Sequence, residues 1–301
     1  MVWMIRPDYG LIRVSGADAR EFLQGQLSND LHLLAANHAL RAAYCSPQGR
    51  VLTLVTLLPQ DDGALMLLPS DLLQSILKRL QMYVLRARVS LQKVECSDRL
   101  ICGDELPGAA RLRDELVHDQ YGLAWVASTE PALAWRLLDT PEQGPETLPY
   151  HANQANLWQI LAGLPALGEG SSGQYIPQML NLDALEAVSF RKGCYTGQEI
   201  VARTQHLGRI KRRLFRISGN GPPPKPGTGV ERDGQSIGQV LISAEAGQGF
   251  AALAVLQLEA VLEHTALEIG GGNVELQPLP YALPGLPNSP AASEGTATRP
   301  E

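Results

Sequence analysis

The sequence predicts an α+β fold whose C-terminal part is almost entirely β-structure. Strand-like runs at 40–45, 50–58 and 64–68 are separated by turn residues and followed at once by an amphipathic helix, which indicates hairpins covered by a helix. Beyond residue 208, short strand-like runs alternate with Gly- and Pro-rich turns, which indicates a small β-barrel or sandwich. Apolar residues make up 45% of the 301 residues and charged residues 19%, values typical of a folded chain.

The N-terminal half is expected to contain two helices with clear start signals. Ser15 and Asp18 form a capping-box pattern that opens the first helix. Ser70 is expected to cap the second, whose apolar residues recur at i, i+3 and i+4 as far as Val84. The other strands expected around these helices lie at 11–14, 88–94 and 100–102.

The second half is expected to open with a crossing segment at 140–149, rich in Pro, Gly and Glu, and a helix at 153–162. Residues 284–301 are mostly Pro, Ser, Ala and Gly with little to bury, and they predict a disordered tail. The C-terminal strand-like runs lie at 214–217, 237–243, 249–258 and 266–276.

Charge and cysteine usage narrow the class of protein. The net charge is −6, yet residues 191–216 carry eight Arg or Lys and one acid, a local charge of +7 that fits an anionic ligand, a nucleic-acid backbone or merely a solvated helix face. Four scattered cysteines predict a reduced, cytoplasmic protein, and their spacing predicts no metal site. No apolar run approaches the ~20 residues that cross a bilayer, and no secretory leader is expected.

The segment 190–203 carries the strongest chemical signal. Gly193 and Gly197 bracket a turn that enters a helix, so Cys194 is expected just ahead of a helix N-terminus, where Arg191 and Lys192 would favour the thiolate. The alternative is structural: the glycines serve a turn, and Cys194 fills a small gap. The other three cysteines lie in strand-like apolar runs and are expected in the core: Cys45, Cys96 and Cys102.

The stretch Lys192–Glu199, Lys-Gly-Cys-Tyr-Thr-Gly-Gln-Glu, resembles the signature of the YgfZ family of folate-binding proteins. Three further segments resemble that family in the same order, so the resemblance extends over residues 8–283: 22–30, 172–182 and 277–281.

This resemblance implies a fold similar to the T-protein, the aminomethyltransferase of the glycine cleavage system. Three domains would then surround a central folate-binding hole: two α+β domains, the first discontinuous, and a β-barrel. The domain ranges expected on this basis are 1–45 with 140–208, then 46–139, then 209–283, with 284–301 as the tail.

The resemblance also implies site residues. Cys194 would be the reactive thiol, with Lys192 and Tyr195 beside it, and folate would bind at Tyr9, Trp158, Gln178, Glu199 and Arg203. The alternative role for Trp158 is that of a core aromatic residue, and Ala155 and Leu161 depart from the family pattern. The catalytic aspartate of the T-protein corresponds to Thr53 or Leu54, neither of which is a carboxylate, so aminomethyl transfer is expected to fail.

Three functions follow from these expectations. The first is a monomeric accessory protein that binds tetrahydrofolate or a derivative and supports iron–sulfur client or assembly proteins, and thereby tRNA modification. The second is a folate-dependent one-carbon transferase with Cys194 as nucleophile. The third is a tRNA-binding protein that uses the basic segment 191–216.

Overall fold

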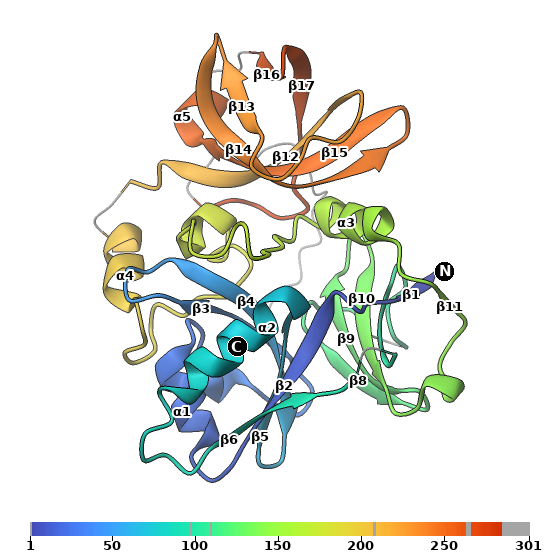
Figure 1. Ribbon diagram of the computed structural model, residues 1–301, viewed down its shortest axis with the longest axis vertical. Coiled ribbons are helices and arrows are strands. Elements are labelled where there is room, and N and C mark those ends of the chain that lie inside the picture. The colour runs from blue at the N-terminus through green and yellow to red at the C-terminus, as the bar shows by residue number, and fades with distance from the viewer. Residues whose placement is uncertain (1, 97, 109, 207–208, 263–265, 285–301) are drawn as a thin grey trace, which may run out of the picture.

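The computed structural model describes residues 2–96, 98–108, 110–206, 209–262 and 266–284. Three sheets form three bodies: a barrel at the top of Figure 1 and two open sheets side by side below it. The predicted α+β class with a β-rich C-terminal part is therefore confirmed. The predicted tail lies outside the described residues, apart from Pro284.

The first open sheet has five antiparallel strands in the order β3-β4-β5-β2-β6. The first helix begins after Asp18 rather than at Ser15, because Ser15 ends a strand and the Asp18 carboxylate binds Arg88 instead of capping. The elements of this body are β2 (Tyr9–Ser15), α1 (Ala19–Gln26), η1 (Leu31–Leu33), β3 (Leu40–Cys45), β4 (Val51–Gln60), β5 (Gly63–Pro69), α2 (Ser70–Gln81) and β6 (Ser90–Val94).

The second open sheet has six strands in the order β11-β1-β7-β10-β9-β8. Its strands are β1 (Trp3–Ile5), β7 (Leu100–Gly103), β8 (Leu116–Asp119), β9 (Gly122–Ser128), β10 (Leu133–Leu138) and β11 (Thr147–Leu148), with η2 (Pro141–Gln143) before the last. The expected domain boundary between residues 45 and 46 falls inside the β3–β4 hairpin, because the first sheet continues to Val94 before the chain enters this one.

The C-terminal body is a closed barrel in the order β12-β15-β14-β13-β16-β17. It closes because β12 pairs with both β15 and β17. The run expected as one strand at 266–276 is two strands, since Gly270 and Gly271 adopt positive φ and turn the chain. The elements are β12 (Arg212–Asn220), β13 (Gly229–Arg232), β14 (Gln235–Ala246), β15 (Gly249–Gln257), α5 (Leu258–Leu262), β16 (Leu267–Ile269) and β17 (Gly272–Gln277).

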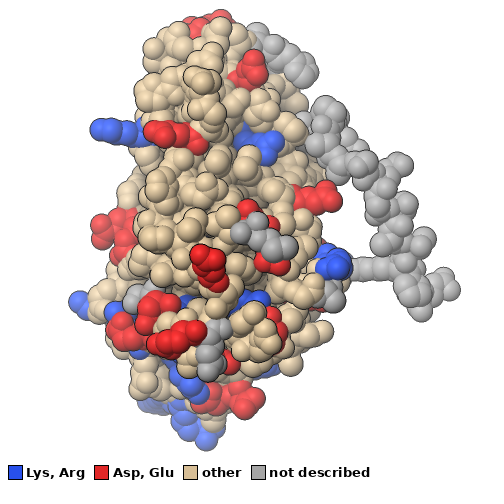
Figure 2. Space-filling model, turned by 90° about the vertical axis from the view of Figure 1, so that its right-hand side faces the viewer, with Lys and Arg blue, Asp and Glu red and all other residues tan. Residues whose placement is uncertain are grey.

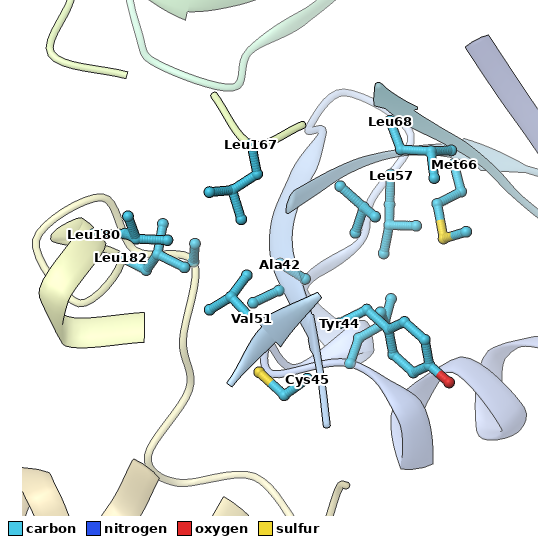
Figure 3. Packing of buried hydrophobic residues seen from close by; sticks show 14 of the residues in the cluster. Ala42, Tyr44, Cys45, Val51, Leu57, Met66, Leu68, Leu167, Leu180 and Leu182 are labelled. Atoms are coloured by element: carbon cyan, nitrogen blue, oxygen red, sulfur yellow. The ribbon is translucent and has the colours of Figure 1, made fainter. Parts of the chain in front are cut away.

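Residues 152–206 lie between the barrel and the open sheets (Figure 1) and contain α3 (Ala152–Leu161), η3 (Pro177–Leu180) and α4 (Gln198–His206). Helix α3 contacts barrel strand β14, where Asn156 donates to the Ser243 carbonyl at 3.3 Å. Figure 3 shows Leu180 and Leu182 directed toward Val51 and Ala42 of the first sheet. The largest core cluster thus includes residues from the first sheet, this segment and the barrel.

Among the described residues, no helix is both long enough and apolar enough to span a membrane.

Candidate functional site

A cavity lies between the two open sheets. Its inner chamber has an empty volume of about 720 Å³, open solvent included, and is lined from β4 by Leu54 and from β9 and β10 by Trp125 and Trp135. The loop residues Leu164–Leu167 and the segment around Leu185 close it from the side of the barrel. The chamber is therefore a mainly apolar pocket with aromatic walls, the kind of surface on which a flat heteroaromatic ring stacks.

The aromatic wall is held rigidly from behind. The ring of Trp135 lies edge-on to the ring of Tyr9, with 4.7 Å between the ring centroids. It is parallel to the ring of Trp125, with 6.3 Å between the centroids. The Arg6 guanidinium sits 4.6 Å from the Trp135 ring, is almost fully buried, and forms two hydrogen bonds of 2.7–2.8 Å with the Asp8 carboxylate. The ring positions are thus fixed by packing and by a partly buried ion pair.

A larger outer chamber adjoins the inner one toward the barrel. The two share five lining residues: Tyr9, Pro69, Gln159, Ala166 and Leu167. The outer chamber has an empty volume of about 1300 Å³, open solvent included, and is also lined by 168–171 and by 239–242 of β14. At the junction the Gln159 amide donates to the Tyr9 hydroxyl at 3.0 Å. The lining therefore changes from mainly apolar and aromatic in the inner chamber to polar and acidic in the outer one, where Asp8, Asp71 and Glu169 lie.

Two neighbouring residues of β4, Thr53 and Leu54, differ in whether they line the inner chamber. Leu54 lines the inner chamber, whereas Thr53 is fully buried outside it and its hydroxyl donates to the Leu54 carbonyl at 3.2 Å. Of the two candidates for the position of the T-protein's catalytic aspartate, Thr53 and Leu54, Leu54 is the one that lines the cavity. Within the described lining the chamber contains no carboxylate, and its one charged residue is Arg41.

The residues expected to bind folate separate into two groups. Tyr9 lines both chambers. Trp158 is 8% exposed and lies in the core cluster of the second sheet, outside the described lining of both chambers, while its neighbour Gln159 on α3 lines both. The helix therefore presents an amide to the cavity and packs its aromatic residue into the core.

Gln178, Glu199 and Arg203 lie around α4, and none of them is among the described lining residues of the cavity. Gln178 is fully buried and donates to the Val201 carbonyl at 2.9 Å, which ties η3 to α4. Glu199 and Arg203 form an exposed ion pair of 2.9 Å along the helix. Gln178 thus has a structural contact, and the other two face solvent.

Cys194 is exposed and lies four residues before the first residue of α4, close to the predicted position. Lys192 is directed away from solvent: its ammonium donates to the carbonyls of Gln24, Leu27 and Asn29 at 2.6–2.9 Å, which uses its three protons. Burial lowers the pKa of Lys192 to about 8. Lys192 therefore anchors the loop to the chain that leaves α1.

Tyr195 is the third residue expected at the thiol, and it is buried. Its ring centroid lies 5.1 Å from the Lys192 ammonium. Burial raises the pKa of its hydroxyl, and the nearby Cys45 raises it further. The Tyr195 side chain thus packs into the protein interior beneath the loop, while the Cys194 side chain is exposed to solvent.

The loop is seated on the β3–β4 hairpin turn through two glycines. Gly197 adopts a φ of +84°, and a Cβ there would lie 2.3 Å from the Ser46 carbonyl oxygen. Gly49, in the turn, faces it, with a virtual Cβ 2.9 Å from Ile200. Because β4 continues from this turn to Leu54 in the inner chamber, one hairpin contacts both the Cys194 loop and the cavity.

The basic side chains of segment 191–216 do not all lie on the protein surface. Arg213 is buried against Asp183, and Arg216 donates to the Leu161 carbonyl at 3.2 Å. The exposed members are Arg191, Arg203, Arg209, Lys211 and Arg212. None of the eight basic residues is among the described lining of either chamber. On the face shown in Figure 2, acidic and basic side chains are interspersed.

The remaining cysteines are where the sequence places them. Cys45, Cys96 and Cys102 are buried, and burial raises the pKa of Cys45 and Cys102 to about 12. Within the described parts of the chain, no group of three His, Cys, Asp or Glu side chains that could hold a metal ion comes together.

Trp125, Trp135, Arg41 and Gln159 were not singled out from the sequence. The two tryptophans are directly opposite each other on β9 and β10. Their signal is present in the chain: two apolar runs, each with one Trp, flank the turn residues Thr129–Pro131. Arg41 carries no local signal, since it follows from tertiary packing alone.

Comparison with known proteins confirms the resemblance. The chain is 29% identical over 304 residues to the "tRNA-modifying protein YgfZ" of Enterobacter sp. (strain 638), covering 92% of both chains. It is 27% identical over 300 residues to the protein of the same name from Yersinia pseudotuberculosis serotype IB (strain PB1/+), covering 92% of this chain and 91% of that one. Residues 211–282 match the family model described as the CAF17 C-terminal beta-barrel domain.

The fold is that of the aminomethyltransferase T-protein. The structure of glycine cleavage system aminomethyltransferase T from Bartonella henselae superimposes with a TM-score of 0.72, at 16% sequence identity, over 92% of this chain and 85% of that one. The likeness extends over nearly all of both chains, so the expected architecture is confirmed.

Proposed function

We propose that this chain is a folate-binding accessory protein that supports tRNA modification, through iron–sulfur client or assembly proteins, with Cys194 as its reactive residue. The observation that carries the proposal is the pair of adjoining chambers, one mainly apolar with aromatic walls and one polar, which share five lining residues. We expect the protein to act in the cytoplasm, as a monomer.

The lining of the two chambers suits part of a folate molecule. A folate joins a flat pterin to a benzoyl group and a charged glutamate tail. Stacking on Trp135 and Tyr9 suits the pterin in the inner chamber, and the polar outer chamber suits the benzoyl amide. The described lining of the outer chamber contains three carboxylates, Asp8, Asp71 and Glu169, and no Lys or Arg, so the negative glutamate tail would extend beyond it. Buried Arg41 and the Gln159 amide supply polar groups at the inner chamber and at the junction. A bound reduced folate supplies the capacity to carry a one-carbon unit.

The chain's own residues bind and orient the ligand rather than transform it. The apolar walls around Leu54 and Leu167 exclude water from the pterin, and the Arg6–Asp8 pair keeps the aromatic wall in place. Because the described lining of the inner chamber has no carboxylate, no general base or counter-charge of the T-protein kind is available there. This favours an accessory role over one-carbon transfer.

The link to tRNA modification rests on the YgfZ relatives, which are named tRNA-modifying proteins. Direct tRNA binding by segment 191–216 is less favoured, because two of its arginines serve as internal contacts and Arg203 is paired with Glu199. The exposed thiol of Cys194 is instead available to a protein partner.

Replacing Ala166 with Phe should weaken binding of tetrahydrofolate. Ala166 lines both chambers, so the larger ring would reduce the space available to a ligand there. We expect the dissociation constant to rise by about tenfold or more, which corresponds to a loss of about 1.4 kcal/mol or more of binding free energy. The measurement is anaerobic isothermal titration of the reduced protein.

Ala36→Phe is the matched control, because Ala36 is exposed and outside the described lining of both chambers. It should bind tetrahydrofolate as the unaltered chain does. Failure of the unaltered chain to bind tetrahydrofolate, or equal affinity in both variants, would contradict the proposed function.

A further inference from the structure

The inner chamber has an unusual charge distribution for a pocket that would hold a carrier of one-carbon units. Among the residues described as lining it, Arg41 alone is charged. Reduced folates differ in charge at the pterin end: the 5-formyl form is neutral there and presents an extra carbonyl oxygen, whereas the 5,10-methenyl form carries a positive charge. A single buried guanidinium can therefore discriminate between them by charge alone.

Arg41 is fixed in place by two contacts. Its Nε donates to Asp114 Oδ1 at 2.7 Å, and its Nη2 donates to the Ala127 carbonyl at 2.5 Å. The side chain is 12% exposed, and any rotation that moved the guanidinium out of the lining would break both hydrogen bonds. The remaining nitrogen, Nη1, is buried and has no hydrogen-bond partner within the described structure. Less than 1 Å² of this atom is exposed, so a ligand oxygen would satisfy that donor only after a shift of the side chains that cover it.

Carboxylates near Arg41 balance its charge, but none of them belongs to the described lining of the inner chamber. Arg41 is paired with Asp114 at 2.7 Å, and Arg113 lies near Arg41, Asp114 and Glu186, so these four groups together carry no net charge. Leu54, which also lines the chamber, provides no counter-charge. Because Arg41 is the charged member of the described lining, a ligand in the chamber meets its guanidinium before either carboxylate.

We propose that Arg41 makes the inner chamber select folates that are neutral at the pterin end and present an oxygen acceptor, and reject cationic forms such as 5,10-methenyltetrahydrofolate. This inference rests on the proposed function. The chain would then hold a one-carbon unit in a resting, unreactive form, opposite to the cationic form that a transferase must stabilise.

The test compares the dissociation constants of 5-formyl- and 5,10-methenyltetrahydrofolate, measured by stopped-flow mixing before the methenyl form hydrolyses. The unaltered chain should bind the formyl form about tenfold or more tightly, the effect expected of one hydrogen bond to a charged group. Arg41→Gln should bring the two constants to within about threefold.

Because Arg41→Gln leaves Asp114 unpaired and could unfold the chain, a second pair of variants keeps Arg41 intact. Leu54→Asp places a carboxylate in the chamber and should lower the preference for the formyl form, whereas the neutral Leu54→Asn should keep it. Equal affinity of the unaltered chain for both folates, or equal preference in the two Leu54 variants, would overturn this inference alone. No binding of either folate would overturn the proposed function and this inference with it.

Discussion

Replacing Arg213 with Met should lower the free energy of unfolding by about 3–5 kcal/mol, the usual cost of breaking a buried ion pair from one side. Arg213 is the second residue of barrel strand β12, and its guanidinium makes two hydrogen bonds of 2.8–2.9 Å with Asp183 of the central segment. Both side chains are 2–3% exposed, so the variant leaves a carboxylate buried without its partner. Urea denaturation followed by circular dichroism measures the loss.

Two further variants separate the lost pair from the lost side chain. Arg212→Met changes the exposed neighbour in the same strand and should shift stability by less than about 0.5 kcal/mol. Combining Arg213→Met with Asp183→Leu removes both charges and should recover most of the lost stability. A double variant as unstable as Arg213→Met alone would show that the charge pair is not the cause.

Replacing Lys192 with Met should destabilise the chain by about 1–3 kcal/mol and displace the loop that carries Cys194. The ammonium is the shared donor for three buried backbone carbonyls, at Gln24, Leu27 and Asn29, and Met offers them none. Since the loop is held by this anchor, Cys194-dependent function in cells should fall together with stability. Thermal unfolding and complementation of a deletion strain measure the two effects.

The controls for this prediction lie on either side in the sequence. Arg191→Met alters an exposed cation beside the loop, and Cys194→Ser alters the exposed thiol. Both should unfold at the temperature of the unaltered chain, and only Cys194→Ser should lose function in cells. If Lys192→Met keeps full stability, the three carbonyls do not depend on its ammonium.

The sequence predicts the local elements of this fold well where the signal lies within one element. The helix expected at 153–162 is α3, and the loop before α4 has Cys194 close to where the glycines place it. The domain boundary expected at 45/46 rests on the family resemblance and falls inside the β3–β4 hairpin, whereas the turn residues Pro47–Gly49 predict that hairpin from the sequence alone.

The side-chain contacts of the candidate site, unlike the local elements, could not be predicted from the sequence. Adjacency in sequence puts Lys192 beside the thiol, but its long side chain reaches back to carbonyls more than 160 residues away. Helical spacing lets Trp158 substitute for Ala155, yet neither lines the described cavity; the aromatic wall comes from β9 and β10, in another sheet. Such contacts depend on how sheets pack, which no local pattern encodes.

The central claim is that folate stacks on the aromatic wall of the inner chamber, and the most direct test compares two tryptophans. Trp135 lines the chamber at 5% exposure, and Trp158 is packed outside its described lining at 8% exposure, so Leu in place of either removes a similar buried ring. Melting temperatures of the two variants establish that each remains folded at the temperature of measurement. The quantity to measure is the dissociation constant of tetrahydrofolate. Trp135→Leu should raise it about tenfold or more, through lost stacking area, and Trp158→Leu should change it by less than about threefold. Unaltered affinity in Trp135→Leu, or a larger loss in Trp158→Leu, would contradict the account.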